Sequence, residues 1–98
     1  MRSFILIGIL SIATGCVSEL TPNGTQVAER TPNEVTSCQH IGVVDAREGM
    51  TWSVQADRRS ALNQIRNSVA ELGGNVFVIN DRYTTAAFTS IQADGYRC

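Results

Sequence analysis

The fold is decided by residues 57–79, which read DRRSALNQIRNSVAELGGNVFVI. Four apolar side chains follow one another at spacings of three, four and three: Leu62, Ile65, Val69 and Leu72. This spacing places them on one face of an amphipathic helix over about 57–72. Gly73 and Gly74 end that helix, because glycine adopts the left-handed backbone conformation beyond the last turn without a steric penalty. Residues 76–79 are entirely apolar, which predicts a central strand that is covered on both faces.

Shorter elements surround this helix and strand. Residues 31–34 read TPNE, a capping-box pattern with proline at the first helical position, so a short helical turn is expected near 32–37. Further strands are expected near 25–29, 39–45, 83–85 and 88–98. A turn at 47–49 is expected to close the strand at 39–45. This order predicts an α+β fold, a small mixed or antiparallel sheet with one main helix packed on one face.

The N-terminus has the features of an export signal. Arg2 precedes an apolar run over 4–13, which is shorter than the roughly 20 residues of a membrane-spanning helix. The run ends in ATGC at residues 13–16, which resembles a bacterial lipobox, although leucine is usual at the position of Ala13. We therefore expect Cys16 to carry acyl chains that hold the protein on a bilayer. A conventional secretory signal with a coincidental cysteine is the alternative.

This reading divides the chain into three parts. They are a signal peptide over 1–15, the lipidated cysteine with a short tether over 16–24, and one disulfide-stapled domain over 25–98. Val17 follows the cysteine, where an aspartate commonly retains Gram-negative lipoproteins in the inner membrane. We therefore expect a lipid-anchored protein of the outer membrane that faces the periplasm.

Two further cysteines, Cys38 and Cys98, remain once Cys16 is acylated. An even pair of thiols in an oxidising compartment predicts a disulfide. The alternative is a metal-binding or redox site, because Cys38 and His40 would share one face of a strand and Cys98 would complete the ligand set. Strong zinc signatures have two paired-ligand motifs and this chain has one, so we expect no metal and no cofactor.

The composition excludes some classes of function. All eight basic residues are arginines, scattered among nine acidic residues, so no phosphate-binding patch stands out and we expect no nucleic-acid partner. His40 is the only histidine, and no serine or threonine lies in a nucleophile motif, so we expect no enzyme. Three carboxylates near the helix start are expected to form a solvated rim rather than a calcium or acid-base cluster: Asp45, Glu48 and Asp57.

Trp52 is the candidate interaction residue, because an exposed tryptophan often anchors a partner. It lies in the expected loop over 47–57. Burial in the small core is an equal alternative for this side chain.

Four segments together resemble a family of small Gram-negative lipoproteins known only as a domain of unknown function. They are LTP at 20–22, CQHIG at 38–42, AELGGN at 70–75 and YRC at 96–98. More remotely, the chain is similar to the outer-membrane sensor lipoprotein of the Rcs phosphorelay, RcsF, in IGVV at 41–44 and NVFV at 75–78. That sensor has a long proline-rich tether and two disulfides, so its signalling role is not carried over.

The sequence thus predicts a non-enzymatic envelope lipoprotein, tethered by acyl chains on Cys16. Its domain is expected to be a protein-interaction module in envelope maintenance or stress sensing, with an envelope protein as partner. The alternative is a small metal-binding or redox lipoprotein that uses Cys38, His40 and Cys98.

Overall fold

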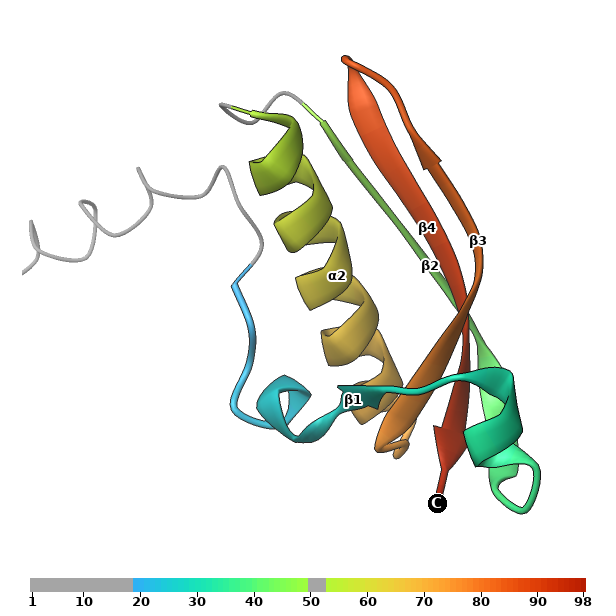
Figure 1. Ribbon diagram of the computed structural model, residues 1–98. Helices are drawn as coiled ribbons and strands as arrows, with labels where there is room; N and C mark the ends of the chain where they lie inside the picture. The colour runs from blue at the N-terminus through green and yellow to red at the C-terminus, as the bar shows by residue number, and fades with distance from the viewer. Residues whose placement is uncertain (1–18, 50–52) are drawn as a thin grey trace, which may run out of the picture.

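The computed structural model describes residues 19–49 and 53–98. The expected signal peptide, Cys16 and Trp52 lie outside these residues, so what the sequence predicts of them stays a prediction. The described elements, in chain order, are η3 (Gly24–Gln26), β1 (Ala28–Glu29), η4 (Pro32–Val35), β2 (Gln39–Gly49), α2 (Val54–Glu71), β3 (Val76–Thr84) and β4 (Phe88–Arg97). Figure 1 shows the long helix standing beside a twisted sheet.

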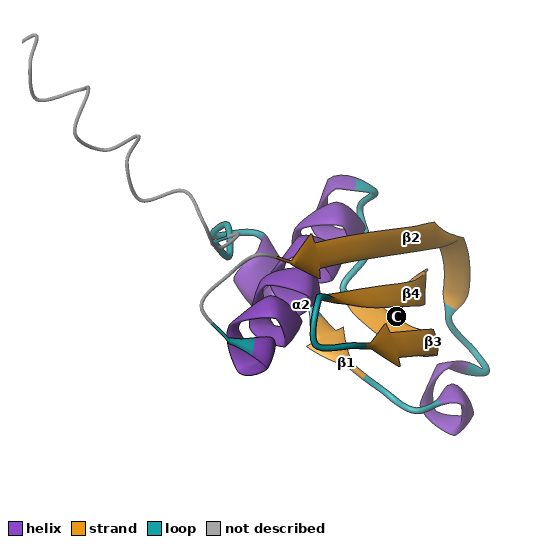
Figure 2. Cartoon of the chain, turned by 90° about the horizontal axis from the view of Figure 1, so that it is seen from above, coloured by secondary structure: helices purple, strands orange, loops and turns teal. Residues whose placement is uncertain are grey.

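The four strands form one mixed sheet in the order β1-β3-β4-β2. β3 and β2 both pair antiparallel with β4, whereas the two-residue β1 pairs parallel with β3. Viewed from above in Figure 2, α2 lies on one side of the sheet. The α+β prediction, with a small sheet and one main helix on one face, is confirmed.

The helix begins earlier than the sequence indicated. Ser53 caps it, accepting a hydrogen bond at Oγ from the backbone N–H of Ala56 at 3.0 Å, so the first turn starts at Val54. Ile65 and Val69 are fully buried as predicted. Leu72 is 47% exposed. Because α2 ends at Glu71, Leu72 is the cap residue and no longer lies on the apolar face of the helix. Gly73 follows with a φ of 87°, as expected of a helix stop.

β3 separates two apolar clusters. Phe77 points to the helix and packs with Ile65, Val69 and other residues of the main core. Val76 and Val78 point to the opposite face, where Val35 of η4 covers them. Val76, Phe77 and Val78, the first three residues of β3, are all buried, so the predicted covering of both faces is confirmed at this end of the strand.

Two predicted boundaries are wrong. β2 continues through residues 47–49 instead of turning there, because these residues pair with residues 88–90 of β4. β3 continues to Thr84, so the separate strand expected at 83–85 is the end of β3. The long hairpin of β3 and β4 supplies hydrogen-bonding partners that outweigh the local turn preference.

The segment before β2 follows its capping pattern. The backbone N–H of Thr31 donates to Glu34 Oε1 at 2.9 Å, and the Thr31 hydroxyl donates to the same oxygen at 3.0 Å. These two bonds, the backbone bond first, lower the pKa of Glu34. The predicted helical turn is confirmed as the 3-10 turn η4. The strand expected near 25–29 is shorter, because Gly24–Gln26 forms η3 instead.

Gly74 allows the end of α2 to approach the sheet. A Cβ at this position would lie 2.8 Å from the Tyr96 carbonyl oxygen and 2.9 Å from Val69 Cγ1, and it would also clash with Ile41. Its own N–H donates to the Val69 carbonyl at 2.9 Å. The second glycine of the pair is therefore required by close packing, not only by the helix stop.

Candidate functional site

The sheet has one face that α2 does not cover. Residues directly opposite one another in the register share a face, and those that alternate along each strand with the residues buried under α2 point away from the helix. We call this surface the open face, and it includes His40, Val43, Asp45, Arg47, Asn80, Asp81, Tyr83, Phe88, Ser90, Gln92, Asp94 and Tyr96.

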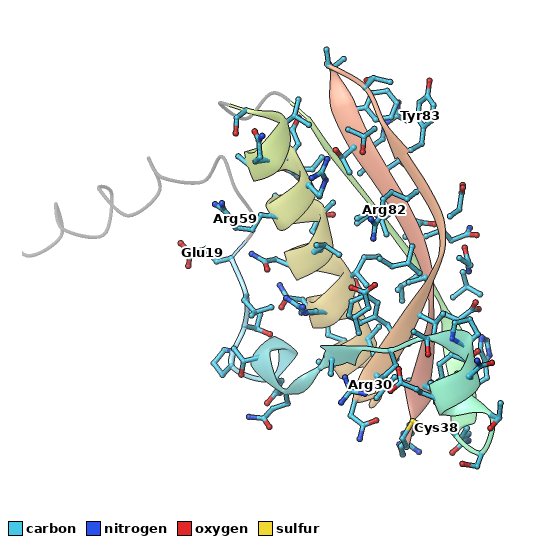
Figure 3. All side chains as sticks on the ribbon, in the orientation of Figure 1. Glu19, Arg30, Cys38, Arg59, Arg82 and Tyr83 are labelled. Atoms are coloured by element: carbon cyan, nitrogen blue, oxygen red, sulfur yellow. A yellow bond between two sulfur atoms is a disulfide. The ribbon has the colours of Figure 1, made fainter. Side chains whose placement is uncertain are left out.

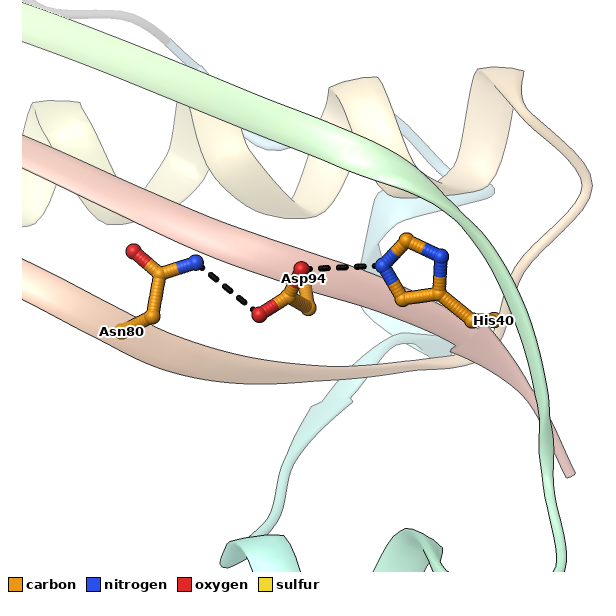
Figure 4. Close-up of polar contacts among 3 residues, drawn as sticks. All are labelled: His40, Asn80 and Asp94. Carbon is orange, nitrogen blue, oxygen red and sulfur yellow. Dashed lines mark hydrogen bonds and ion pairs between the residues drawn. The ribbon is translucent and has the colours of Figure 1, made fainter.

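A polar cluster crosses three strands of the open face (Figure 4). His40 Nε2 on β2 lies 2.9 Å from Asp94 Oδ1 on β4. Asn80 on β3 donates from Nδ2 to the other carboxylate oxygen of Asp94, also at 2.9 Å. The Tyr96 ring meets the His40 ring edge to face, with centroids 5.2 Å apart. One carboxylate thus ties β2, β4 and β3 together on their outer surface.

Two irregularities of the sheet make this cluster possible. The register shifts between His40 and Gly42 on β2 and again between Ile79 and Asp81 on β3. A bulge places an extra residue in one strand and redirects its side chain. The shift on β3 lets the Asn80 side chain reach Asp94. The shift on β2 follows His40, which bonds to the other oxygen of the same carboxylate.

The cluster holds Asp94 in its charged form. The hydrogen bond from Asn80, and then that from His40, lowers the pKa of the Asp94 carboxyl below its ordinary value. The His40 side chain is 47% exposed and that of Asp94 is 26% exposed, so solvent reaches both groups. When the imidazole is protonated, the pair becomes a surface ion pair, whose contribution to stability is small.

The other end of the open face is aromatic. The Arg47 guanidinium lies over the Phe88 ring, 4.0 Å from its centroid, and the Tyr83 ring is 5.8 Å from the Phe88 ring. Tyr83, labelled in Figure 3, is 58% exposed. Between this group and the polar cluster, Asp45, Gln92 and Asp81 form one row across β2, β4 and β3. The open face therefore combines aromatic surface with carboxylates.

A family model described as a domain of unknown function, DUF4156, matches residues 18–98 of this chain. The chain belongs to the DUF4156 family. The resemblance to a domain of unknown function is thus confirmed. No curated protein and no solved structure matches the chain. The more remote likeness to the Rcs sensor lipoprotein has no support from these comparisons.

The DUF4156 domain brings the two predicted cysteines together. The Sγ atoms of Cys38 and Cys98 lie 2.00 Å apart, at disulfide distance, which is consistent with the predicted bridge. Asn75 also holds the last residue: its Oδ1 accepts from the Cys98 N–H at 2.9 Å, and its Nδ2 donates to the Cys98 carbonyl at 3.1 Å. The C-terminal residue of the domain is thus fixed on two sides.

The metal alternative needed His40 beside these cysteines. The imidazole instead bonds to Asp94, and each cysteine sulfur contacts the other. Within residues 19–49 and 53–98, no group of three histidine, cysteine, aspartate or glutamate side chains is arranged to hold a metal ion. His40 itself is exposed on β2, as expected of a surface strand residue.

The three carboxylates predicted as one solvated rim separate in the DUF4156 domain. Asp45 is exposed on the open face. Glu48 points the other way and accepts a hydrogen bond from Gln64 of α2. Asp57 is only 3% exposed, so its assignment to a solvated rim is wrong. Its position in the first turn of α2 suits a buried carboxylate, because the helix dipole favours negative charge there.

The sequence analysis missed most of the open face. Asp94, Asn80 and the group of Arg47, Phe88 and Tyr83 were not singled out. One signal was available in the sequence, since the apolar Ile91 and Ala93 alternate with the polar Ser90, Gln92 and Asp94. Reading that alternation would have placed Phe88 and Asp94 on one surface. Their partners on β2 and β3 depend on the register, which local sequence does not specify.

The described part of the DUF4156 domain, residues 19–49 and 53–98, encloses no pocket. None of its helices is both long enough and apolar enough to cross a membrane.

Proposed function

We propose that this DUF4156 protein is an envelope lipoprotein whose domain makes protein contacts through the open face. In this proposal acyl chains on Cys16 hold it to the outer membrane, facing the periplasm, and it is not an enzyme. The lipobox-like segment at 13–16 supports the anchor, and the cysteine pair at disulfide distance fits an oxidising compartment. A role in envelope maintenance or stress sensing follows from that location.

One observation carries the proposed protein contact. The open face exposes two large apolar side chains: Val43 on the edge strand β2 is 55% exposed, and Tyr83 near the end of β3 is 58% exposed. Between them lie the carboxylates of Asp45 and Asp81 and the stacked Arg47. Exposed aliphatic and aromatic side chains interspersed with charged groups suit a protein-protein interaction site. The aromatic and arginine content matches the residue types that dominate binding energy in such interfaces.

The anchor is tested by intact mass and fractionation of the protein from its own cells. The mature wild-type protein should lack residues 1–15 and carry acyl mass on Cys16, whereas Cys16→Ser should abolish both changes. A second variant, Val17→Asp, should keep the acyl chains and move the protein to the inner membrane. An unmodified Cys16 in the wild-type protein would refute the anchor.

The contact is tested by photo-crosslinking in the native envelope. A photoreactive residue in place of Tyr83 should capture a defined protein, and the same residue in place of Gln55 on α2 serves as the matched control. Adding Asp45→Arg and Asp81→Arg should abolish the capture, because these changes reverse the charge of the row beside Tyr83. Equal capture from both positions, or capture insensitive to the charge reversal, would refute the open face as the interaction surface.

A further inference from the structure

The two edges of the sheet differ in how much backbone they leave unpaired. At one edge, β1 covers the first two residues of β3, and the N–H of Arg30 donates to the Phe77 carbonyl at 2.9 Å. At the other edge lies β2, which has eleven residues. Within residues 19–49 and 53–98, β2 pairs with β4 on one side and with no strand on the other. Figure 2 shows β2 as the outermost strand, on the far side of β4 from β3.

The free edge of β2 is regular over most of its length. Alternate residues of an edge strand direct their N–H and C=O groups outward, where another strand can pair with them. The register shift of β2 lies near its start, and residues 43–49 then pair with β4 without interruption. On β3 the shift lies between Ile79 and Asp81, in the part that β1 does not cover. Because a bulge twists an edge away from further pairing, β2 offers the better template.

Opposite charges alternate along this regular stretch. Asp45 and Arg47 are exposed and point to the open face, since Val44 and Ala46 are buried under α2. Neither Asp45 nor Arg47 belongs to an ion pair within the described part of the chain. Arg47 lies over the Phe88 ring, and a guanidinium in contact with an aromatic face can still donate to a carboxylate from its edge. The strand therefore carries an acid and a base that are not matched within one molecule.

An antiparallel second copy of β2 would match these charges. When the two Ala46 residues lie opposite each other, Asp45 of each copy lies opposite Arg47 of the other. Two-fold symmetry makes this pair occur twice. Side chains directly opposite on one face of an antiparallel pair have Cβ atoms about 4.5–5.5 Å apart, and opposite charges at these positions stabilise the pairing.

The neighbouring two-fold registers are less favourable. Centring the pair on Asp45 places two carboxylates opposite each other, and centring it on Arg47 places two guanidinium groups opposite each other. Like charges directly opposite are destabilising. Centring it on Val44 places Asp45 opposite Val43 and forms no ion pair between these groups. The charge pattern therefore selects the register centred on Ala46.

We propose that two copies of this chain associate through antiparallel pairing of their β2 edges, centred on Ala46. Two four-stranded sheets then join into one, with both α2 helices on one side and both open faces on the other. The pairing uses the same edge of both copies, so it closes at a dimer instead of continuing into a filament. This association does not depend on acylation of Cys16, and it doubles the surface to which we assign protein contacts.

Sedimentation equilibrium measures the association. The full chain, as purified from cells, is studied over a range of protein concentrations in an excess of detergent micelles. The wild-type protein should show a monomer–dimer equilibrium. Asp45→Arg alone and Arg47→Asp alone should each weaken dimerisation about tenfold or more, because two attractive pairs become two repulsive ones. A wild-type protein that stays monomeric at every concentration would overturn the proposal.

Mixtures and a double variant test the register. An equimolar mixture of the two single variants should dimerise, because each copy then meets opposite charges on the other. The double variant Asp45→Arg with Arg47→Asp should dimerise with itself as the wild type does, but not with the wild type. Asp81→Arg on β3 is the matched control and should leave dimerisation unchanged. Folded variants, judged by circular dichroism, that associate neither in the mixture nor as the double variant would contradict the pairing.

Hydrogen exchange locates the contact in the wild-type protein without any substitution. Raising the protein concentration should slow exchange severalfold at alternate amides of residues 43–49, those that point away from β4, because these amides become paired. The amides of residues 79–84 on the other edge should exchange at the same rate throughout. Slower exchange on β3 instead, or no change on β2, would show that the copies do not pair through β2.

Discussion

The two faces of the sheet are made by the same strands but carry different side chains. Along β4, Thr89, Ile91 and Ala93 are buried under α2, whereas Gln92 between them is exposed. The helix-covered face is apolar and closely packed, whereas the open face carries charged and aromatic side chains except where η4 covers Val76 and Val78. The main apolar core therefore lies under α2, whereas the open face leaves charged and aromatic side chains exposed to solvent.

The sharpest test of this comparison uses neighbours on β3. Phe77 is fully buried in the main cluster, and Val78 is 7% exposed in the small cluster beneath η4. Phe77→Ala should lower the free energy of unfolding by about 3–5 kcal/mol, and Val78→Ala by about 2 kcal/mol. Urea unfolding followed by circular dichroism measures both. Equal losses would mean that the two clusters contribute alike.

Replacing the cysteine pair tests how far a disulfide stabilises the part of the domain around the small cluster beneath η4. Cys38 packs against the small cluster, which has few apolar residues of its own. Replacing both cysteines by serine should cost about 4 kcal/mol by the chain-entropy estimate for this loop. Wild-type protein with a reducing agent is the control and should unfold like the variant. A variant as stable as the oxidised wild type would show that no bridge contributes.

The approach of α2 to the sheet is tested at two glycines that both lie beside Val69. Gly74→Ala should cost about 2 kcal/mol, because the new Cβ meets the Tyr96 carbonyl and Val69 with no room to move. Gly95→Ala should cost less, since its nearest neighbour, Val69 Cγ2, would be 3.3 Å away. Thermal unfolding compares the two variants, and the reverse order would contradict the packing described here.

The smallest effect is expected on the open face, from Asp94. Its pKa is lowered in the folded protein, so the carboxylate stabilises the fold above the ordinary aspartate pKa of about 3.9, and this contribution is lost as the pH falls through the folded value. Asp94→Asn should therefore cost at most about 1 kcal/mol near neutral pH and nothing in strong acid. Titration of Asp94 by NMR provides the direct check. Asn80→Ala should raise its pKa more than His40→Phe does, because the Asn80 bond is the larger cause.

The covered face could largely be predicted from the sequence. Ile65 and Val69 are found by helical periodicity, and Gly73 marks the end of the helix through local backbone chemistry. The extent of the strands could not be predicted, because residues 47–49 look like a turn until β4 is there to pair with them. Local preferences determine where elements occur, and long-range pairing determines how far they extend.

The open face could not be predicted in the same way. His40 and Asp94 are 54 residues apart, and their contact depends on two register shifts that leave no pattern in the chain. The cysteine pair could be predicted from the sequence, because an even number of cysteines in an oxidising compartment indicates a bridge without any knowledge of the geometry. The predicted exposure of Asp57 is wrong, because composition alone does not distinguish an exposed carboxylate from one buried in the first turn of a helix.

The position of β4 has a consequence for how the chain acquires its structure. β4 is the last strand in the sequence, yet it lies between β3 and β2, which do not pair with each other. A chain that emerges N-terminus first from a ribosome or a translocation pore cannot assemble this sheet until β4 has emerged. Most pairings join distant segments, so assembly of the sheet waits until β4 is available. Such a delay suits the proposed export, in which the chain would cross a membrane before it folds.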